Sequence, residues 1–320
     1  MAIKPIFQDA KREACKASIM IEGLPGKGKT GLALDIAYAL SGNWQKVFMV
    51  DTENESAKLF EGLMSAQGLK FDPWKHGSLS ADVGYSPGNY LAYRAEAVHQ
   101  GAEVCIFDSV SHAWSYKGGI LDMVSQAKAN NPRYAKDNYA AWGDENVVRE
   151  KNDLLELIRG PLHMITTVRV KERFEYSTDA DGKTKLISMG EQQIQQADLK
   201  YEPDLVLHMI RPGKNRETLV YPRAFVIKSR YAILEEGIEY DFTPALLAQL
   251  RDYLAEGVDP NVLLEAQRAE YAEAVKNLLD AQPRYLPIWK VLKQDAGFKD
   301  TKLEEIPLHE LRTLYVKLTS

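Results

Sequence analysis

The sequence predicts an α/β fold with a largely parallel sheet, followed by a small helical domain. Short apolar segments rich in β-forming residues alternate with helical patterns from about residue 17 to 234, which is typical of βαβ units. A glycine-rich segment at 23–30 lies where the first strand would pass into the first helix. Beyond residue 241 only helical patterns follow. We therefore expect an α/β core at 1–242 and a helical C-terminal domain at 243–320.

The composition excludes several classes of protein. The 320 residues are 45% hydrophobic and 27% charged, which is typical of a globular protein of about two domains. The net charge of −5 provides no overall attraction to nucleic acid, so a contact with DNA needs a local basic patch. The N-terminal segment is polar and no run of 18 apolar residues follows it, so we expect a cytoplasmic protein without membrane contact.

The expected elements follow from apolar spacing and from breaker residues. Strands are expected in short apolar runs, and helices where apolar residues recur every three or four positions. A long loop is expected at 114–142. The expected strands are 18–22, 46–50, 104–107, 162–168, 205–209 and 224–227. The expected helices are 29–40, 55–67, 90–100 and 146–159 in the core, and 244–254, 260–281, 285–294 and 308–318 beyond it.

The strongest motif is G-x-x-x-x-G-K-T at 23–30, between an expected strand and an expected helix. Glycines let successive backbone N–H groups turn toward a phosphate, and the helix N-terminus adds its positive dipole end. Lys29 would reach the β- and γ-phosphates of ATP, and the Thr30 hydroxyl would ligate Mg²⁺. The alternative is a glycine-rich turn that only joins strand and helix. The residues expected to bind the nucleotide here are Gly23, Pro25, Gly26, Lys27, Gly28, Lys29 and Thr30.

Two further expected strands end in carboxylates. The apolar segment 104–108 ends in Asp108 and has the form of a Walker B element, whose carboxylate holds Mg²⁺ through water. The segment 47–53 ends in Asp51, Thr52 and Glu53. Since parallel sheets bind ligands at the carboxyl ends of their strands, Glu53 is a candidate for the base that deprotonates the attacking water. The alternative is that Asp51 and Glu53 cap the following helix.

In order along the chain, these elements resemble the RecA/RadA recombinase core. The shared motifs are the P-loop, a strand ending in D-T-E, a Walker B strand ending in Asp108-Ser109, and a strand reading T-T-V-R-V-K at 166–171. The resemblance covers about residues 17–231. It implies a RecA-like P-loop ATPase with Glu53 as catalytic glutamate and Thr167 in the place of the glutamine that senses the γ-phosphate. The short N-terminus and compact core look most like phage-encoded RecA-like ATPases, including those of the single-strand annealing type, which implies a host cytoplasm.

The segment Lys228-Ser229-Arg230 looks like the RadA K-N-R-F motif, which reaches into the nucleotide site of a neighbouring subunit. The resemblance implies a homo-oligomer with nucleotide at the subunit interfaces. In such an oligomer, Lys228 and Arg230 of one subunit would stabilise the charge that develops in the transition state at the nucleotide of its neighbour. The alternative is an edge strand that ends in solvated cations.

A basic and aromatic segment follows the T-T-V-R-V-K strand. Between residues 169 and 230 the acidic chain has 12 Lys or Arg against 9 Asp or Glu, and Asp-Gly at 181–182 predicts a hairpin turn. Basic side chains would contact the DNA backbone, and aromatic rings would stack on bases. The alternative is a solvated edge hairpin. The residues expected to contact single-stranded DNA are Arg169, Lys171, Arg173, Lys183 and Lys185.

The sequence thus predicts a slow, DNA-stimulated ATPase that uses ATP and Mg²⁺ and acts on single-stranded DNA in phage-type recombination or replication, by annealing or strand exchange. A single-strand binding protein is a further expected partner. Two alternatives stay open. One is a nucleotide-gated module that binds DNA or a protein, and the other is a helicase- or loader-type ATPase without recombinase activity.

Overall fold

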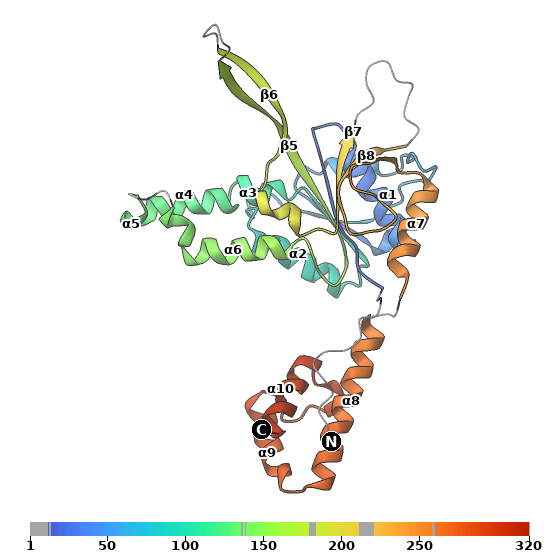
Figure 1. The fold of residues 1–320 in the computed structure, drawn as a ribbon, viewed down its shortest axis with the longest axis vertical. Coiled ribbons are helices and arrows are strands. Elements are labelled where there is room, and N and C mark those ends of the chain that lie inside the picture. The colour runs from blue at the N-terminus through green and yellow to red at the C-terminus, as the bar shows by residue number, and fades with distance from the viewer. Residues whose placement is uncertain are drawn as a thin grey trace. The chain divides into compact units, whose positions relative to one another are not determined.

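The computed structural model describes residue 12 and residues 14–135, 137, 139–178, 184–210, 221–257 and 260–319. Contacts between residues divide the chain into two units, Lys16–Leu254 and a unit that contains Ala255–Ser320. Figure 1 shows the larger unit as a central sheet flanked by helices. Among the described helices, none combines the length and the apolar character that crossing a bilayer requires.

A mostly parallel sheet forms the larger unit. Its described strands are β1 (Ser18–Gly23), β2 (Val47–Asp51), β3 (Lys75–Ser78), β4 (Val104–Asp108), β5 (His163–Thr178), β6 (Thr184–Gln193), β7 (Leu205–Ile210), β8 (Arg223–Ser229) and β9 (Glu239–Asp241). Their order is β3-β2-β4-β5-β1-β7-β8-β9, and β6 pairs with β5. The pairs from β3 to β7 are parallel, whereas β5–β6, β7–β8 and β8–β9 are antiparallel. The predicted α/β fold class is confirmed.

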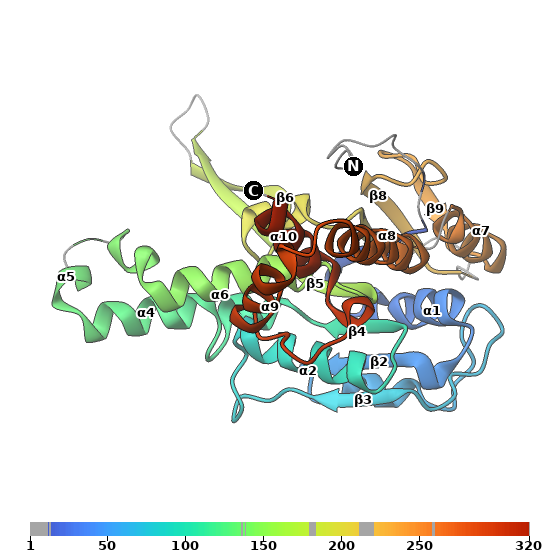
Figure 2. The same cartoon turned by 90° about the horizontal axis from the view of Figure 1, so that it is seen from below.

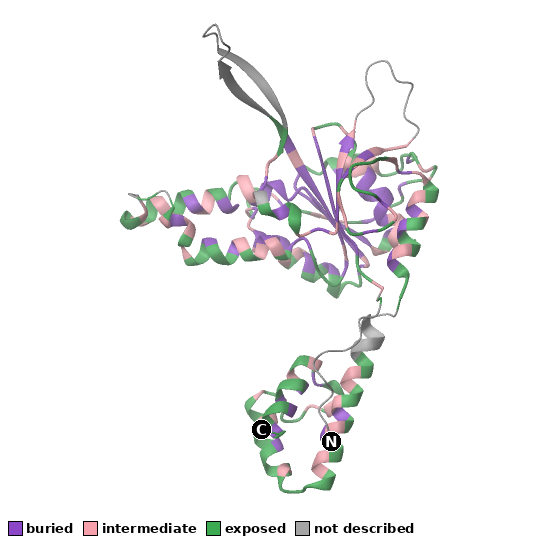
Figure 3. Ribbon diagram, viewed as in Figure 1, coloured by how far each residue is buried: buried purple, intermediate pink, exposed green. Residues whose placement is uncertain are grey.

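Alternating side chains of the strands pack into two cores, one on each face of the sheet. The covering helices are α1 (Lys29–Ser41), α2 (Pro87–His99), α6 (Glu145–Glu156) and α7 (Pro244–Ala255). Ile19 and Val104 belong to the core that includes residues of α1 and α7. Met20 and Cys105, the next residues along the same strands, belong to the core with α2 and α6. Figure 3 shows that the buried residues concentrate along these strands.

A helical excursion, not the expected long loop, follows β4. It contains α3 (Ser111–Ser115), α4 (Ile120–Asn130), α5 (Pro132–Ala135) and a 3-10 turn at Ala140–Gly143. Val124 and Val147 pack around Ala141, and the rings of Trp114 and Trp142 stack with centroids 6.0 Å apart. Figures 1 and 2 both show α4 and α6 side by side, extending away from the sheet. Trp114 and Trp142 therefore help to anchor the helices of this segment to one another.

The helix expected at 55–67 does not form, and that prediction was wrong. Only a 3-10 turn is present, η2 (Ser56–Phe60). Glu55 and Gly62 have φ values of 61° and 80°, and a right-handed helix cannot include residues in this left-handed conformation. Two strands, β3 and β9, were not predicted, because both are short and largely polar.

Helix α7 belongs to the larger unit. Leu247, Leu250 and Leu254 recur along one face of α7, are buried, and join the same core as α1. The contacts therefore place the division of the chain after Leu254, and not at 243 as expected from the sequence. The smaller unit has its own core around Val275 and Trp289. Its helices are α8 (Pro260–Ala281), α9 (Tyr285–Asp295) and α10 (Leu308–Thr319).

This packing predicts that Leu250→Ala destabilises the sheet. Leu250 is 1% exposed, so its truncation should lower the free energy of unfolding by about 2–5 kcal/mol. Hydrogen–deuterium exchange of peptides from β1 and β7 should become faster. Leu286→Ala, at a 44% exposed position of α9, is the matched control and should leave the exchange of these peptides unchanged. Wild-type exchange in Leu250→Ala would show that α7 does not support the core.

Candidate nucleotide-binding site

The P-loop between β1 and α1 can receive a phosphate. Gly26 and Gly28 have φ values of 73° and 91°, a conformation that glycine adopts without steric cost. A Cβ on Gly26 would meet no described atom within 4 Å, and one on Gly28 would meet only the Met209 methyl group, at 3.9 Å. No side chain of the described residues caps the first turn of α1. The N–H groups of that turn can therefore bind an anion.

A cavity of about 500 Å³ lies beside the P-loop. Gly28 and Leu32 form one wall, and the rings of Phe60 and Tyr221 contribute to others. Asp35 also lines it, and burial raises the pKa of its carboxyl to about 6. The size and the apolar and aromatic lining suit the nucleoside part of a nucleotide whose phosphates bind the P-loop.

Lys29 lies at the mouth of the loop. Its Nζ donates hydrogen bonds to the carbonyl oxygens of Gly23 at 2.8 Å and Leu24 at 3.2 Å. Burial lowers the pKa of Lys29, although the negative charges of Asp108 and Glu53 act in the opposite direction. The ammonium group is thus held between the P-loop and the two carboxylates, where it can compensate phosphate charge.

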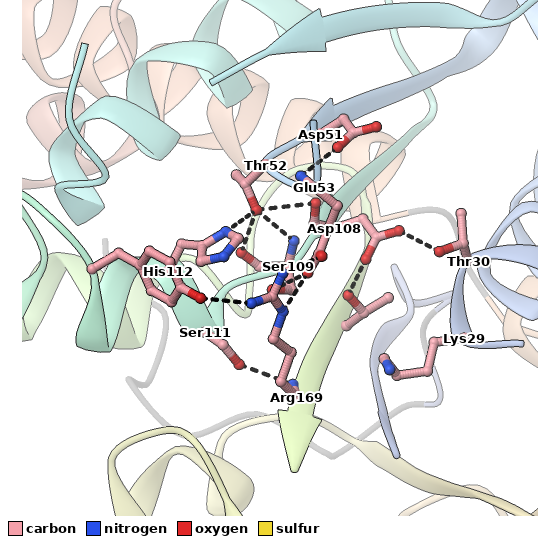
Figure 4. A network of polar contacts seen from close by, with 12 residues as sticks. Lys29, Thr30, Asp51, Thr52, Glu53, Asp108, Ser109, Ser111, His112 and Arg169 are labelled. Carbon is pink, nitrogen blue, oxygen red and sulfur yellow. Dashed lines mark hydrogen bonds and ion pairs between the residues drawn. The ribbon is translucent and has the colours of Figure 1, made fainter. Parts of the chain in front are cut away.

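Asp108 is the buried carboxylate of the site, with 2% exposed (Figure 4). Thr30 Oγ1 donates to its Oδ2 and Thr167 Oγ1 donates to its Oδ1, each at 2.5 Å. Burial raises the pKa of the Asp108 carboxyl, against the effect of these two hydrogen bonds. A carboxylate and a hydroxyl supply the oxygen ligands that Mg²⁺ prefers. A buried carboxylate is also stabilised by a cation that compensates its charge. Thr30 and Asp108 therefore fit the Mg²⁺ site expected from the sequence.

Thr167 is fully buried, and its hydroxyl is engaged by Asp108. In this position it orients the Walker B carboxylate. Its expected contact with the γ-phosphate stays a prediction.

The two carboxylates at the end of β2 have different roles. Asp51 is the cap, because its Oδ1 accepts the Glu53 N–H at 2.6 Å and its Oδ2 accepts the Ala57 N–H at 3.1 Å. The Glu53 side chain lies instead among residues of β4 and β5 (Figure 4). Its Oε1 accepts a hydrogen bond from Ser109 Oγ at 3.1 Å. The sequence left open whether Asp51 and Glu53 cap a helix or belong to the site. In the structure Asp51 caps the turn, and Glu53 lies in the site.

Arg169 pairs with Glu53, which the sequence analysis did not foresee. Its Nε donates to Oε1 at 2.6 Å, and its Nη2 donates to Oε2. Burial raises the pKa of Glu53, but the hydrogen bonds and charge of Arg169 outweigh it, so that the pKa lies below its ordinary value. The two residues are 116 positions apart, and no local pattern indicates their contact.

A buried polar network behind Glu53 was also missed. The Thr52 hydroxyl accepts the Ser109 N–H at 2.9 Å and lies 2.5 Å from His112 Nδ1, and the Tyr90 hydroxyl donates to the Ser109 carbonyl at 2.9 Å. The peptide bond between Asp108 and Ser109 is cis. Burial, with a contribution from the Arg169 charge, lowers the pKa of His112 to about 4, so its imidazole is neutral at pH 7. The only signal in the sequence was the place of Thr52 between two acidic residues.

Lys228 and Arg230 contact their own chain. Lys228 Nζ donates to the carbonyl oxygens of Tyr201 and Pro203, both at 2.6 Å, and Arg230 Nη1 donates to Asp204 Oδ1 at 2.6 Å. Burial lowers the pKa of Lys228, and the nearby charge of Arg230 adds to this effect.

The register places this strand end away from the P-loop. Ser229 pairs with Leu205, which in turn pairs with Ile19 near the start of β1. The P-loop begins at Gly23, roughly 13 Å further along β1 by strand rise. A contact of Lys228 or Arg230 with a γ-phosphate would therefore be made with another subunit.

Four of the five residues expected to contact DNA lie on β5 or β6. The two strands pair from Val170–Gln193 to Thr178–Thr184, in agreement with the predicted hairpin. Lys171 is exposed, and the Arg169 side chain is 27% exposed. Lys183 and the side chains of Arg173 and Lys185 lie outside the described residues.

The contact between Thr167 and Asp108 gives a prediction for metal binding. Thr167→Val removes the donor to Oδ1 and should weaken Mg²⁺-dependent ATP binding about 10- to 100-fold, because residues that orient a metal ligand have effects of this size. The control is Thr166→Val, whose hydroxyl is equally buried but makes only a 3.4 Å contact with the Ile19 carbonyl. Titration of ATP binding against Mg²⁺ measures both. The same Mg²⁺ dependence in the two variants would contradict the assignment.

Comparison with known protein families agrees with this geometry. Residues 15–234, which contain the P-loop, Glu53, Asp108 and the β5–β6 hairpin, match the family model described as an AAA domain. Among curated proteins, a search found no match to the chain. With its P-loop, Walker B carboxylate and mostly parallel sheet, the chain belongs to the AAA-domain family of P-loop ATPases.

Proposed function

We propose that this chain is a RecA-like ATPase that hydrolyses ATP in response to single-stranded DNA, in phage-type recombination or replication. The observation that carries the proposal is the continuity of β5. This strand pairs with β1 and β4 inside the sheet and continues into the hairpin with β6 (Figure 1). One strand thus carries Thr167 beside Asp108 and, four residues later, the exposed Lys171. A ligand on the hairpin would be linked to the ATP site through this single element.

The site residues have complementary places in phosphoryl transfer. The P-loop N–H groups and Lys29 would bind the β- and γ-phosphates of ATP. Mg²⁺ held by Thr30 and Asp108 would neutralise charge on these phosphates. Glu53 would orient the attacking water and accept its proton, and Ser109 steadies the Glu53 carboxylate.

We also infer a homo-oligomer with nucleotide at the subunit interfaces. The position of Lys228 and Arg230 at the strand end away from their own P-loop supports a role toward a neighbouring subunit. A single-strand binding protein is a further proposed partner, since it covers the same DNA.

A second candidate function is a nucleotide-gated module that binds DNA or a protein and turns over little ATP. The pairing of Arg169 with Glu53 favours it, because a carboxylate held by an arginine is a weak base. A helicase- or loader-type ATPase would use the same site. The rate of hydrolysis with and without DNA separates the gated module from both ATPases.

Single-stranded DNA should raise the rate of ATP hydrolysis by the wild-type chain. Lys29→Ala should abolish turnover with and without DNA, because it removes the charge that compensates the β- and γ-phosphates. Lys46→Ala is the control, since Lys46 Nζ donates to the Gly101 carbonyl away from the site. A steady-state ATPase assay measures all three proteins. Turnover by Lys29→Ala would reject the P-loop assignment, and a wild-type rate that DNA does not change would favour the gated module.

Mixed oligomers test the interface. The double variant Lys228→Ala/Arg230→Ala should lose turnover in the assembled state yet keep its fold and ATP binding, because the cations act on a neighbour. Added Lys29→Ala subunits retain both cations and should partly restore activity, since some interfaces then pair an intact P-loop with intact cations. ATPase assays of mixtures shown to co-assemble provide the measurement. If no activity returns, the two residues are strand-end cations without a catalytic role.

A further inference from the structure

Arg169 lies where β5 leaves the central sheet. Its partner on β1 is Gly23, the last residue of that strand and the first of the P-loop. The next residue, Val170, already pairs with Gln193 of β6. Arg169 therefore belongs both to the edge of the nucleotide site and to the root of the hairpin.

The guanidinium of Arg169 holds Glu53 at both carboxylate oxygens (Figure 4). Its remaining nitrogen, Nη1, donates to the Tyr116 hydroxyl at 2.9 Å, and the guanidinium carbon lies 5.7 Å from the centroid of that ring. The backbone N–H of Arg169 donates to Ser111 Oγ at 2.9 Å. Backbone and side chain are both held in place, so the grip on Glu53 has a defined geometry.

In this arrangement Glu53 is a poor general base. Oε1 accepts hydrogen bonds from Arg169 and Ser109, and Oε2 accepts one from Arg169. These three bonds occupy most of the roughly four acceptor positions of a carboxylate. The lowered pKa of Glu53 further weakens it as a proton acceptor.

We propose that Arg169 is a clamp on Glu53 that a phosphate group of single-stranded DNA releases. Without DNA, the guanidinium keeps the carboxylate from the attacking water. A DNA phosphate at the root of the hairpin takes over the guanidinium, and Glu53 then accepts the proton from water. This inference rests on the proposed function, because it needs DNA as the ligand of the hairpin. Arg169 acts through Glu53 and is a positioning residue.

The surroundings of Arg169 suit a competing phosphate. Guanidinium groups form bidentate hydrogen bonds with phosphates as they do with carboxylates. The Arg169 side chain is 27% exposed, which leaves it within reach of a ligand from solvent. Lys171, two residues further, is exposed, whereas Val170 between them is buried. The two cations therefore lie on the same side of the strand, where they can contact neighbouring phosphates.

The γ-phosphate of ATP is the other possible source of the phosphate, because the charge of Arg169 reaches Lys29 of the P-loop and helps to lower its pKa. We favour DNA because Arg169 and Lys171 share one side of the strand that forms the hairpin. The two sources give opposite results in the first experiment. Release by DNA means that loss of Arg169 accelerates DNA-free hydrolysis, whereas a direct contact with the γ-phosphate means that the loss slows it.

The first experiment compares DNA-free ATP hydrolysis by Arg169→Gln and the wild type. Loss of the clamp frees the general base and should raise DNA-free kcat by up to about 10²-fold, the lower end of what a positioned base contributes, and should reduce stimulation by DNA toward none. Arg169→Lys keeps the charge without the bidentate fork and should give an intermediate rate. The control Arg251→Gln removes an exposed arginine that pairs with its neighbour Asp252, and should keep the wild-type rates. In variants with wild-type thermal unfolding, an unchanged or lower DNA-free rate overturns the clamp.

The second experiment measures DNA affinity without hydrolysis, in the presence of a non-hydrolysable ATP analogue. Because coupling between two sites is reciprocal, removing the charge of Glu53 must help DNA to bind Arg169. Glu53→Gln should therefore bind a fluorescent single-stranded oligonucleotide about 5-fold or more tightly than the wild type. Glu55→Gln, which removes an exposed carboxylate that pairs with Lys58, should show wild-type affinity.

The outcomes of this experiment separate the clamp from the proposed function. If the wild type binds DNA and Glu53→Gln binds it equally well, the clamp is overturned and the proposed function stands. If the wild type does not bind DNA, both are overturned. If Glu53→Gln binds DNA more tightly than the wild type, this result supports the clamp even when Arg169→Gln does not fold.

The pH profile of kcat provides a readout that a merely structural role would not change. Without Arg169, burial is the largest remaining influence on Glu53 and raises its pKa. The acid limb of the profile should therefore lie at higher pH in Arg169→Gln than in the wild type, and an unmoved limb overturns the clamp. The other titratable groups coupled to Glu53 are Lys29 of α1, Asp108 of β4, His112 of α3, Tyr90 of α2 and Tyr85 before α2.

Discussion

The buried carboxylate of Asp108 joins the elements of the nucleotide site. Its side chain accepts hydrogen bonds from Thr30 of α1 and Thr167 of β5, and its backbone carbonyl accepts the Thr52 N–H at the end of β2, at 2.8 Å. A carboxylate buried to this extent is stable only while its hydrogen bonds are satisfied. The P-loop helix, the end of the strand before Glu53 and the strand that continues into the hairpin are therefore held in register by one residue, through its side chain and its backbone carbonyl, and none can shift alone without breaking a buried hydrogen bond.

The ion pair between Arg169 and Glu53 is partly buried, and its strength should lie between that of surface and buried ion pairs. Its side chains are 27% and 25% exposed, between the surface pairs that contribute about 0–1 kcal/mol and the buried pairs whose disruption costs about 3–5 kcal/mol. A fully exposed pair would not hold a carboxylate, and a fully buried one would not yield to a ligand. His112, whose pKa is lowered to about 4, is neutral at pH 7 and adds no positive charge that would compete with Arg169 for Glu53.

Features that depend on local spacing could be predicted from the sequence, and features that depend on distant contacts could not. The P-loop and the cores of β1, β2 and β4 follow from short-range patterns, and the family match agrees with the P-loop assignment. The helix expected at 55–67 failed because the backbone at Glu55 and Gly62 is left-handed, which no apolar periodicity reveals. Arg169 was predicted from the sequence to contact DNA, yet its partner Glu53 is far away in sequence. Tertiary hydrogen bonds alone show that Asp51 caps the turn after β2 and that Glu53 lies in the site.

The pairing of β5 with β6 limits how the projecting hairpin can vary in length. Side chains alternate between the two faces of a strand, so that inserting or deleting one residue between the sheet and a given position would turn every side chain beyond it to the other face. Changes of two residues in each arm keep the facing intact. The irregularity between Glu172 and Phe174 is the one register shift recorded among the described pairs of this hairpin, and it lies beyond Arg169 and Lys171. Longer or shorter arms are therefore compatible with the same ATP site, provided that the residues up to Lys171 keep their present register.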